Sequence, residues 1–525
     1  MTKRDDSTFL KGAFVLTGAG ILVKLIGALN RIPLYSILGD EGMGLYQMAY
    51  PIYTILLTVS SSGLNVAISK VVAERWALGK RVQAADAFRV ALALMAVLGL
   101  ASTLILYFSA GWIADNMAHD PRAAISIRAL SPALFTVAVL SAFRGWFQGI
   151  EKMEVPALTQ VVEQVGRLVT MLFLANMLLP RGLEVAAAGA TLGASVGAFV
   201  AAMWALAAYF RGPRPWLNER RRVEASDFWS DTTKRIITIA APISLASAIF
   251  GITEIVDLAI VPGRLQSIGL ETQEATRQFG RLAAGAFPLL NLPTLFTSAL
   301  QMALVPSISA AMALGDRDAV RRRVMKALSL TLALAVPAAI GLYVLAEPIP
   351  TLLYSQPEVA PILRTLTPAV VFLALQQVTA GVLHGLGRLR APLVNLAWAV
   401  GIKAVVTYVL VGTPSLGILG AGIATSVHFG IAGLLNLRAV MRDTGPVLNW
   451  RDLLKLPLAG GAMAVAAVLA YSRLSVLVSW KVATLAAVGV GAVVYGVFAL
   501  LLGIVRSEDL AAFPLLGRFF GTPEK

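Results

Sequence analysis

Long apolar runs alternate with short charged segments along almost the whole chain. At about 20 apolar residues per membrane crossing, these runs predict about fourteen transmembrane helices. The predicted spans are approximately 11–38, 45–72, 84–110, 123–150, 155–180, 185–210, 233–260, 278–306, 324–346, 361–386, 391–411, 416–440, 454–474 and 481–504. The runs are long and do not alternate with a period of two, so a β-barrel is not expected.

The composition agrees with a polytopic membrane protein. Of 525 residues, 57% are hydrophobic and only 14% are charged, whereas soluble domains carry about 25% charged residues. This excludes an ordinary soluble enzyme, a disordered chain and a nucleic-acid-binding domain. The chain has no cysteine, and its three histidines, His119, His384 and His428, are far apart. Neither a disulfide nor a metal site is therefore expected.

The charged loops predict the orientation in the membrane. There are 44 Lys and Arg against 29 Asp and Glu, and basic residues collect in cytoplasmic loops. The most basic stretches are 211–235 and 317–326. They predict that both termini of a multi-pass membrane protein lie in the cytoplasm. The charged N-terminus precedes a full-length span, so no removable signal peptide is expected. The segment 211–235 has two compatible interpretations, a hinge between halves and a loop that lies on anionic lipid.

An internal repeat relates the two halves of the chain. Ser-Pro-Ala at 131–133 matches Thr-Pro-Ala at 367–369, and four further positions match at the same offset: Gly145, Gly149, Pro156 and Arg167 with Gly381, Gly385, Pro392 and Lys403. An even number of helices in each copy makes the repeats parallel, an arrangement found in transporters that hold substrate between two halves. The predicted domains are a six-helix lobe at 1–210, a basic linker at 211–232, a six-helix lobe at 233–440, and two further helices with the tail at 441–525.

Ionisable residues inside the predicted spans are the candidate site, because such residues are costly in a membrane. The cations are Lys24, Arg31, Arg144, Arg167, Lys403 and Arg281, and the acids are Glu163, Glu254 and Asp257. A cleft with more cations than carboxylates suits an anion, and a phosphate or pyrophosphate pairs well with arginine. A cation or drug exporter would need carboxylates and aromatic side chains instead.

Several of these residues have a second interpretation. Arg144 and Arg281 are also positioned to reach a nearby membrane interface. Glu163 precedes Arg167 by four residues, which suits a pair within one helix. Glu254 and Asp257 fit either the lip of a cleft or a site for a coupling ion. Neither a nucleotide-binding loop nor a catalytic triad is visible, and the outer loops are too short for an active site, so the chain is not expected to be an enzyme.

Several motifs resemble a known family. They are KLIG at 24–27, RIPL at 31–34, GDEG at 39–42, GLYQ at 44–47, YPIY at 50–53, RGWFQG at 144–149 with Glu163, Gln164 and Arg167, VPGRL at 261–265 and VPSIS at 305–309. They are similar to polysaccharide exporters of the branch that contains stage V sporulation protein B and the Gram-positive MurJ-type lipid II flippases. This branch lies within the multidrug/oligosaccharidyl-lipid/polysaccharide (MOP) superfamily. Asn65 departs from the branch, which usually has Pro there. Arg281 is only a loose counterpart of an arginine in the eighth helix of lipid II flippases of the other branch.

The resemblance implies an all-α, MATE-like fold of fourteen helices, with two six-helix pseudo-twofold lobes and a lipid-tail groove on the last two helices. It also implies a V-shaped cationic cavity and the flipping of an undecaprenyl-pyrophosphate-linked sugar, most specifically lipid II, by alternating access. The expected partners are this lipid-linked glycan, membrane lipids and enzymes of wall synthesis, with no nucleic acid and a monomeric chain. No cofactor is expected beyond a monovalent ion or the membrane potential. The rival interpretations are an exporter of another lipid-linked glycan or sporulation precursor, a cation or drug exporter, a membrane glycan polymerase and a non-transporting scaffold.

Overall fold

The computed structural model describes residues 16, 18–20, 22–23, 26–27, 29–212, 225–447 and 450–504. All regular secondary structure within these residues is helical. Twelve helical stretches are long and apolar enough to cross a membrane, and they coincide with twelve of the predicted spans. The predicted span 233–260 lies inside one further long helix, and the predicted span 11–38 is only partly described. The all-α polytopic fold is therefore confirmed, and the total of fourteen stays a prediction.

The chain divides into two compact units after Gly280. The first unit contains the helices α2 (Arg31–Met48), α3 (Tyr50–Leu57), the π-helix η1 (Thr58–Ser62), α4 (Gly63–Ala77), α5 (Arg81–Asn116), α6 (Ala123–Leu130), α7 (Pro132–Gly149), α8 (Glu154–Leu178), the 3-10 helix η2 (Leu179–Arg181), α9 (Leu183–Arg211), α10 (Ala225–Ser267) and α11 (Thr272–Gly280).

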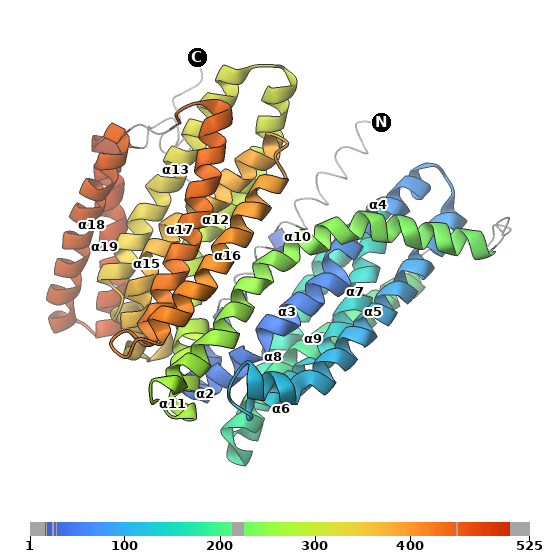
Figure 1. The fold of residues 1–525 in the computed structure, drawn as a ribbon, viewed down its shortest axis with the longest axis horizontal. Helices are drawn as coiled ribbons and strands as arrows, with labels where there is room; N and C mark the ends of the chain where they lie inside the picture. The colour runs from blue at the N-terminus through green and yellow to red at the C-terminus, as the bar shows by residue number, and fades with distance from the viewer. Residues whose placement is uncertain are drawn as a thin grey trace. The chain divides into compact units, whose positions relative to one another are not determined.

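The second unit begins at Arg281. It contains the π-helix η4 (Arg281–Ala286), α12 (Phe287–Ala313), α13 (Arg317–Val344), α14 (Pro348–Tyr354), the 3-10 helix η5 (Pro357–Val359), α15 (Ala360–Gly385), α16 (Arg390–Val411), α17 (Ile418–Thr444), α18 (Trp450–Leu477) and α19 (Trp480–Leu501). The last two helices pack side by side and contact α13 (Figure 1). The Tyr495 hydroxyl on α19 donates a hydrogen bond to the Ala333 carbonyl on α13 at 2.6 Å, which fixes this pair to the rest of the unit.

Helix α10 packs within the first unit, although the predicted second lobe begins at 233. It contacts α3, η1 and α4, and Figure 1 shows it as a long, bent helix. A β-carbon at Gly63 would lie 2.3 Å from the Ala240 carbonyl oxygen, so only glycine permits this approach. The backbone N–H of Gly63 also donates to the Ser244 hydroxyl at 3.2 Å. The predicted lobe boundaries follow the repeat and stay a prediction, and much of the linker 211–232 lies outside the described residues.

The repeat has a physical counterpart in the packing of each unit. In the first unit α7 packs on α4, α5 and α9, and in the second unit α15 packs on α12, α13 and α17. A β-carbon at Gly149 of α7 would lie 2.7 Å from the Val72 β-carbon of α4. A β-carbon at the matching Gly385 of α15 would lie 2.8 Å from the Ile308 β-carbon of α12. The repeated glycines therefore permit the same close helix crossing in both units.

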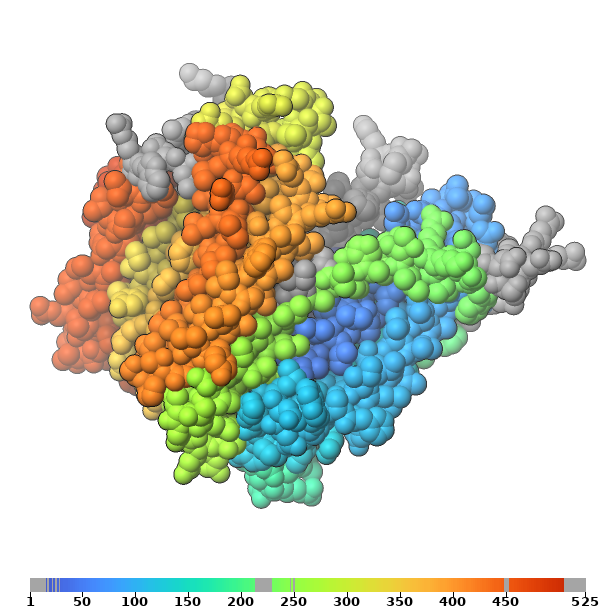
Figure 2. Space-filling view, viewed as in Figure 1, coloured from blue at the N-terminus to red at the C-terminus, as the bar shows by residue number. Residues whose placement is uncertain are grey.

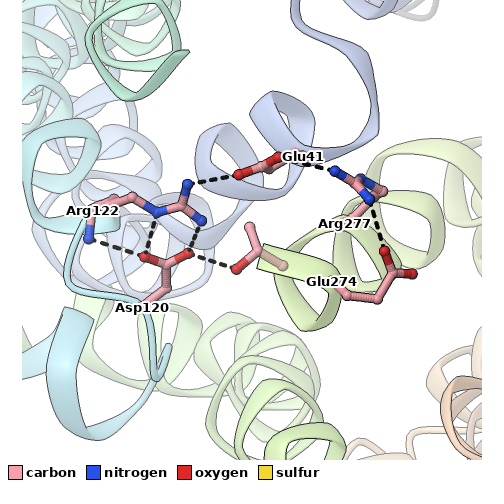
Figure 3. A network of polar contacts seen from close by, with 6 residues as sticks. Glu41, Asp120, Arg122, Glu274 and Arg277 are labelled. Atoms are coloured by element: carbon pink, nitrogen blue, oxygen red, sulfur yellow. Dashed lines mark hydrogen bonds and ion pairs between the residues drawn. The ribbon is translucent and has the colours of Figure 1, made fainter. Parts of the chain in front are cut away.

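A six-residue polar network ties α11 to the rest of the first unit (Figure 3). Glu41 pairs with Arg122 at 2.6 Å and with Arg277 of α11 at 3.3 Å. Asp120 pairs with Arg122 at 2.8 Å and accepts the Thr276 hydroxyl at 2.6 Å. Arg277 also pairs with Glu274, the sixth member, at 2.8 Å. The hydrogen bond from Arg122 to Asp120 raises the pKa of the Arg122 guanidinium, and the one from Arg122 to Glu41 raises it to a smaller extent. The guanidinium therefore remains charged at any physiological pH.

Candidate functional site

The candidate site is a cavity of about 350 Å³ inside the first unit. We call it the tyrosine–arginine cavity. Its walls come from the segment before α2 and from α2, α3, α7 and α8. The lining residues are Val23, Gly27, Asn30, Arg31, Tyr46, Gln47, Tyr50, Tyr53, Thr54, Leu57, Val137, Glu163, Gln164 and Arg167. Among the described residues of this lining, the charged ones are two arginines and one glutamate.

Three tyrosines form one wall of the cavity. Tyr46, Tyr50 and Tyr53 are spaced four and three residues apart, so a helical backbone places them on one face. The Tyr46 and Tyr50 rings are 4.9 Å apart between centroids, and the Tyr50 and Tyr53 rings are 6.0 Å apart. The Tyr50 hydroxyl donates to the Tyr46 hydroxyl at 2.8 Å. The wall therefore presents a chain of phenolic hydroxyl groups to the arginine opposite.

Arg167 on α8 faces this wall. One terminal nitrogen of its guanidinium donates to the Tyr50 hydroxyl at 2.6 Å and to the Tyr46 hydroxyl at 3.3 Å. Its guanidinium carbon lies 5.4 Å from the centroid of the Tyr50 ring, within range of a cation–π interaction. Its Nε is buried and has no hydrogen-bond partner. Within the described part of the chain, Arg167 makes no ion pair.

The backbone of α8 at Arg167 is held by glycines of α9. A β-carbon at Gly197 would lie 2.6 Å from the Arg167 backbone nitrogen, and one at Gly193 would lie 3.0 Å from its carbonyl oxygen. These approaches require glycine, because a side chain would force α8 and α9 apart. The close packing of α9 on α8 therefore fixes the Arg167 backbone, from which the side chain reaches the Tyr50 hydroxyl.

Glu163 pairs with Arg144 rather than with Arg167. The Arg144 guanidinium on α7 lies 2.7 Å from the Glu163 carboxylate, and these side chains are 12% and 18% exposed. Arg144 also donates through Nε to the Thr159 hydroxyl at 3.0 Å. The predicted pair within α8 was therefore wrong, because a helix on the neighbouring side offers Glu163 a better-placed partner. The same contact accounts for Arg144 without its side chain reaching a membrane interface.

The electrostatic result is a cavity suited to an anion. Glu163 is the only carboxylate among the described residues of the lining, and it is already neutralised by Arg144. Arg31 lines the cavity and makes no hydrogen bond or ion pair with the described residues. Arg31 and Arg167 therefore contribute two positive charges, and Asn30, Gln47 and Gln164 add neutral amide donors. Cations inside a membrane span without carboxylate partners are costly, and a bound anion would relieve that cost.

The other predicted site residues are not among the described residues that line this cavity. Lys24 lies outside the described residues. Glu254 is exposed and Asp257 is buried on α10 of the first unit, and neither lines the tyrosine–arginine cavity. Arg281 is the first residue of η4 in the second unit. Lys403 is fully buried on α16 of that unit.

Sequence reasoning missed the tyrosines as site residues. The spacing of Tyr46, Tyr50 and Tyr53 was a usable signal, because three aromatic residues with phenolic oxygens share one face of a span. Tyr46 and Tyr50 can be recognised as site residues only because their hydroxyl groups accept hydrogen bonds from Arg167, which is more than a hundred residues away in sequence. No pattern within the span itself indicates that pairing.

The comparison with known families decides where the chain belongs. The family described as "Polysaccharide biosynthesis protein" matches residues 9–312, more than half of the chain. The chain belongs to this family. The MatE family matches residues 282–409, and the resemblance to the MOP superfamily is confirmed. The family and the helical fold together make the chain a multi-pass membrane protein of that superfamily.

Individual relatives of this family member are similar over most of its length. Stage V sporulation protein B of Bacillus subtilis (strain 168) is 29% identical over 515 residues, which are 97% of this chain and 98% of that protein. Lipid II flippase MurJ of the same organism is 26% identical over 454 residues, which are 82% of each chain. Among solved structures, lipid II flippase MurJ in an inward closed conformation has a TM-score of 0.68 at 16% identity, with 93% of this chain and 98% of that chain covered. The solved structure supports the fold alone.

Proposed function

We propose that this protein is a flippase that carries an undecaprenyl-pyrophosphate-linked cell-wall precursor, lipid II, from the inner to the outer leaflet. The main support for the proposal is the set of contacts that Arg167 makes. This arginine is held by two tyrosine hydroxyls, makes no ion pair in the described part of the chain, and shares its cavity with Arg31. A pyrophosphate would supply the negative charge that the cavity lacks.

The chemistry of the lining fits such a headgroup. Arginine binds phosphate oxygens through its planar fork of N–H donors, and such charge-assisted hydrogen bonds are stronger than neutral ones. The unpartnered Nε of Arg167 leaves a donor available for this purpose. The tyrosine rings add flat, amphipathic surfaces that can pack against a sugar. The prenyl tail would remain in lipid while the headgroup crosses the membrane.

Alternating access is the proposed transport cycle. Parallel repeats with a site near the membrane midplane are typical of transporters that rock one half against the other. The repeated glycine crossings at Gly149 and Gly385 support two halves of the same construction. We place both termini in the cytoplasm and the protein in the inner membrane as a monomer, with enzymes of wall synthesis as candidate partners. Coupling would come from a monovalent ion or from the membrane potential, with Glu254 and Asp257 as candidate acids.

A second cargo is favoured by one specific observation. Similarity to stage V sporulation protein B extends over 97% of the chain, whereas similarity to lipid II flippase MurJ extends over 82%. The alternative is therefore a different lipid-linked glycan or sporulation precursor carried by the same mechanism. Export of a cationic drug is disfavoured, because the one carboxylate that lines the cavity within the described part of the chain, Glu163, is already paired with Arg144.

The test is rescue of a bacterium depleted of its own lipid II flippase. Growth and the amount of lipid II accessible on the outer leaflet would be measured in parallel. We expect the wild-type chain to restore both and an Arg167→Ala variant expressed at the same level to restore neither. Failure of a correctly inserted, well-expressed wild-type protein would refute lipid II as cargo and support the second cargo. Full rescue by Arg167→Ala would refute the assigned site.

A further inference from the structure

The second unit contains a pair of joined cavities that the transport site does not explain. They have volumes of about 590 and 270 Å³, and they share Arg388, Arg442 and Asp443. The larger one is lined by the start of α13, the α15–α16 connection and the end of α17. Figure 2 shows the end of α17 beside the region where α12 meets α13. These elements belong to the side that the basic loops predict to be cytoplasmic.

Five arginines surround the joined cavities, which we call the arginine pocket. They are Arg317, Arg321, Arg388, Arg438 and Arg442, and the acids beside them are Asp318 and Asp443. Among ion pairs between described residues, only one involves these arginines, that of Arg388 with Asp443 at 2.9 Å. Arg321 donates through Nε to the Pro446 carbonyl at 3.2 Å. Within the described residues Arg317, Arg438 and Arg442 have neither an ion pair nor a hydrogen bond, so the pocket retains a marked positive charge.

Local helix electrostatics explains only some of these arginines. Arg438 and Arg442 stand near the C-terminus of α17, where the helix dipole favours a cation. Arg317 and Arg321 stand in the first two turns of α13, where the same dipole disfavours a cation and favours an anion. The arginines of α13 therefore increase a positive potential that the helix end already creates. Such a concentration of charge around a cavity favours the binding of an anion.

The inner part of the pocket differs from a site for a free ion. The smaller cavity is lined by Leu383, Ala391, Leu435 and Ala439, and it reaches Asn395 one turn into α16. Asn395 donates to the Asn436 amide oxygen at 2.8 Å. The Asn436 amide nitrogen is buried and has no hydrogen-bond partner. A charged rim thus leads to an apolar wall with amide groups, which fits a headgroup that carries both a phosphate and a hydroxyl.

The outer surface of α16 continues this apolar character. Val394 and Trp398 are 53% and 67% exposed, and they are four residues apart on the face next to the one that holds Ala391 and Asn395. In a membrane-spanning helix such a face contacts acyl chains. A lipid whose phosphate lies among the arginines would therefore find an apolar path beside the pocket for its chains.

We infer that the arginine pocket binds the phosphodiester headgroup of an anionic glycerophospholipid from the inner leaflet. The guanidinium groups of Arg438 and Arg442 contact the phosphate, and the headgroup hydroxyl reaches toward Asn395. This site lies within the second unit and is separate from the tyrosine–arginine cavity, so it goes beyond the proposed transport function and does not depend on it. It gives the protein a preference for anionic membrane lipid that is independent of its cargo.

Native mass spectrometry of the purified full chain tests this inference. The probes are dioleoyl phosphatidylglycerol and dioleoyl phosphatidylethanolamine, which have the same acyl chains and differ in headgroup charge. We expect phosphatidylglycerol to bind at least about ten-fold more tightly. We expect the double variant Arg438→Gln/Arg442→Gln to lose about ten-fold of that affinity, because two charge-assisted contacts are removed. The charge-conserving variant Arg438→Lys/Arg442→Lys should retain most of it.

Two controls separate the site from general surface charge. Arg211→Gln removes an exposed basic residue at the end of α9 in the first unit, and it should leave binding unchanged. An equal loss in Arg211→Gln and in the double glutamine variant would overturn the inference. Displacement of phosphatidylglycerol by inorganic phosphate at an equal concentration would also overturn it, because the site would then bind a free anion. Both glutamine variants change exposed side chains, and an unchanged elution volume would show that they fold.

Discussion

The Arg144 guanidinium on α7 holds the Glu163 carboxylate on α8 at 2.7 Å. This pair strongly affects the charge of the tyrosine–arginine cavity, because no other carboxylate of the described residues lines it. One helical turn further along α8, Arg167 has tyrosine hydroxyls as partners instead. Arg144 therefore acts on the cavity indirectly, by keeping Glu163 away from Arg167.

Arg144→Ala is expected to weaken anion binding even though Arg144 does not line the cavity. Without its partner, Glu163 is free to pair with Arg167 four residues along the helix. In Arg144→Ala/Glu163→Gln that competing carboxylate is absent, so affinity should return. We expect a coupling free energy of about 0.5–3 kcal/mol between the two positions. Titration of the four purified proteins of this cycle with pyrophosphate measures it, and additive effects would contradict the indirect role.

Arg167→Ala is expected to lower pyrophosphate affinity by about 10- to 100-fold, because charge-assisted hydrogen bonds contribute about 1.5–3 kcal/mol each. Expression should stay near the wild-type level, since the lost contacts are with tyrosine hydroxyls that also bond to each other. The measurement is pyrophosphate titration of purified protein, with Arg167→Lys as the charge-conserving comparison. Unchanged affinity in a folded Arg167→Ala protein would remove Arg167 from the site.

Tyr50→Phe is expected to have a smaller effect of the same sign. It removes the 2.6 Å hydrogen bond that orients the Arg167 guanidinium, and one such bond contributes about 1 kcal/mol. Pyrophosphate affinity should therefore fall by about five-fold. Tyr107→Phe on α5 is the matched control, because that exposed tyrosine is not part of the cavity. A loss in Tyr50→Phe that is no larger than in the control would show that Arg167 is oriented by its helix alone.

Much of this fold could be predicted from the sequence, because membrane spans carry strong local signals. The apolar runs located twelve of the described spans to within a few residues at most ends. The offset between Gly149 and Gly385 predicted two related halves, and the packing of each glycine against its neighbouring helix agrees with that. A glycine at a helix crossing is needed because any side chain would clash with the neighbouring helix. A repeated glycine therefore indicates a close crossing even before the neighbouring helix is known.

The polar pairings could not be predicted, because they depend on which helices become neighbours. Glu163 and Arg167 have the correct spacing for a pair within α8, yet α7 places Arg144 closer to the carboxylate. The α10 helix presents a similar case, because its contact with α4 depends on the close approach of Gly63 and Ala240, which are far apart in sequence. Sequence spacing decides which contacts are possible, and the packing between helices selects among them.

Glu41→Gln is expected to loosen α11 from the rest of the first unit. Glu41 is the only member of the six-residue polar network that pairs with both Arg122 and Arg277. The neutral amide loses the charge that holds Arg277, so amide protection of residues 272–280 should fall by about ten-fold, equivalent to ~1.4 kcal/mol. Hydrogen–deuterium exchange measures this. Glu271→Gln, an exposed acid just before α11, is the control, and equal exchange in the two variants would contradict a role for the network in holding α11.

Alanine substitution of the repeated glycines is expected to destabilise both units in the same way. The new methyl group would lie 2.7 Å from the Val72 β-carbon in Gly149→Ala and 2.8 Å from the Ile308 β-carbon in Gly385→Ala. Overpacking of this kind costs about 1–3 kcal/mol, and the thermal midpoint should fall by roughly 2–4 °C per kcal/mol. Gly401→Ala on α16 is the matched control, because a β-carbon there meets nothing within 4 Å. Tryptophan fluorescence during heating measures all three proteins. An unchanged midpoint in Gly149→Ala would mean that α4 and α7 have room between them. It would contradict the conclusion that the two units are built on the same close helix crossing.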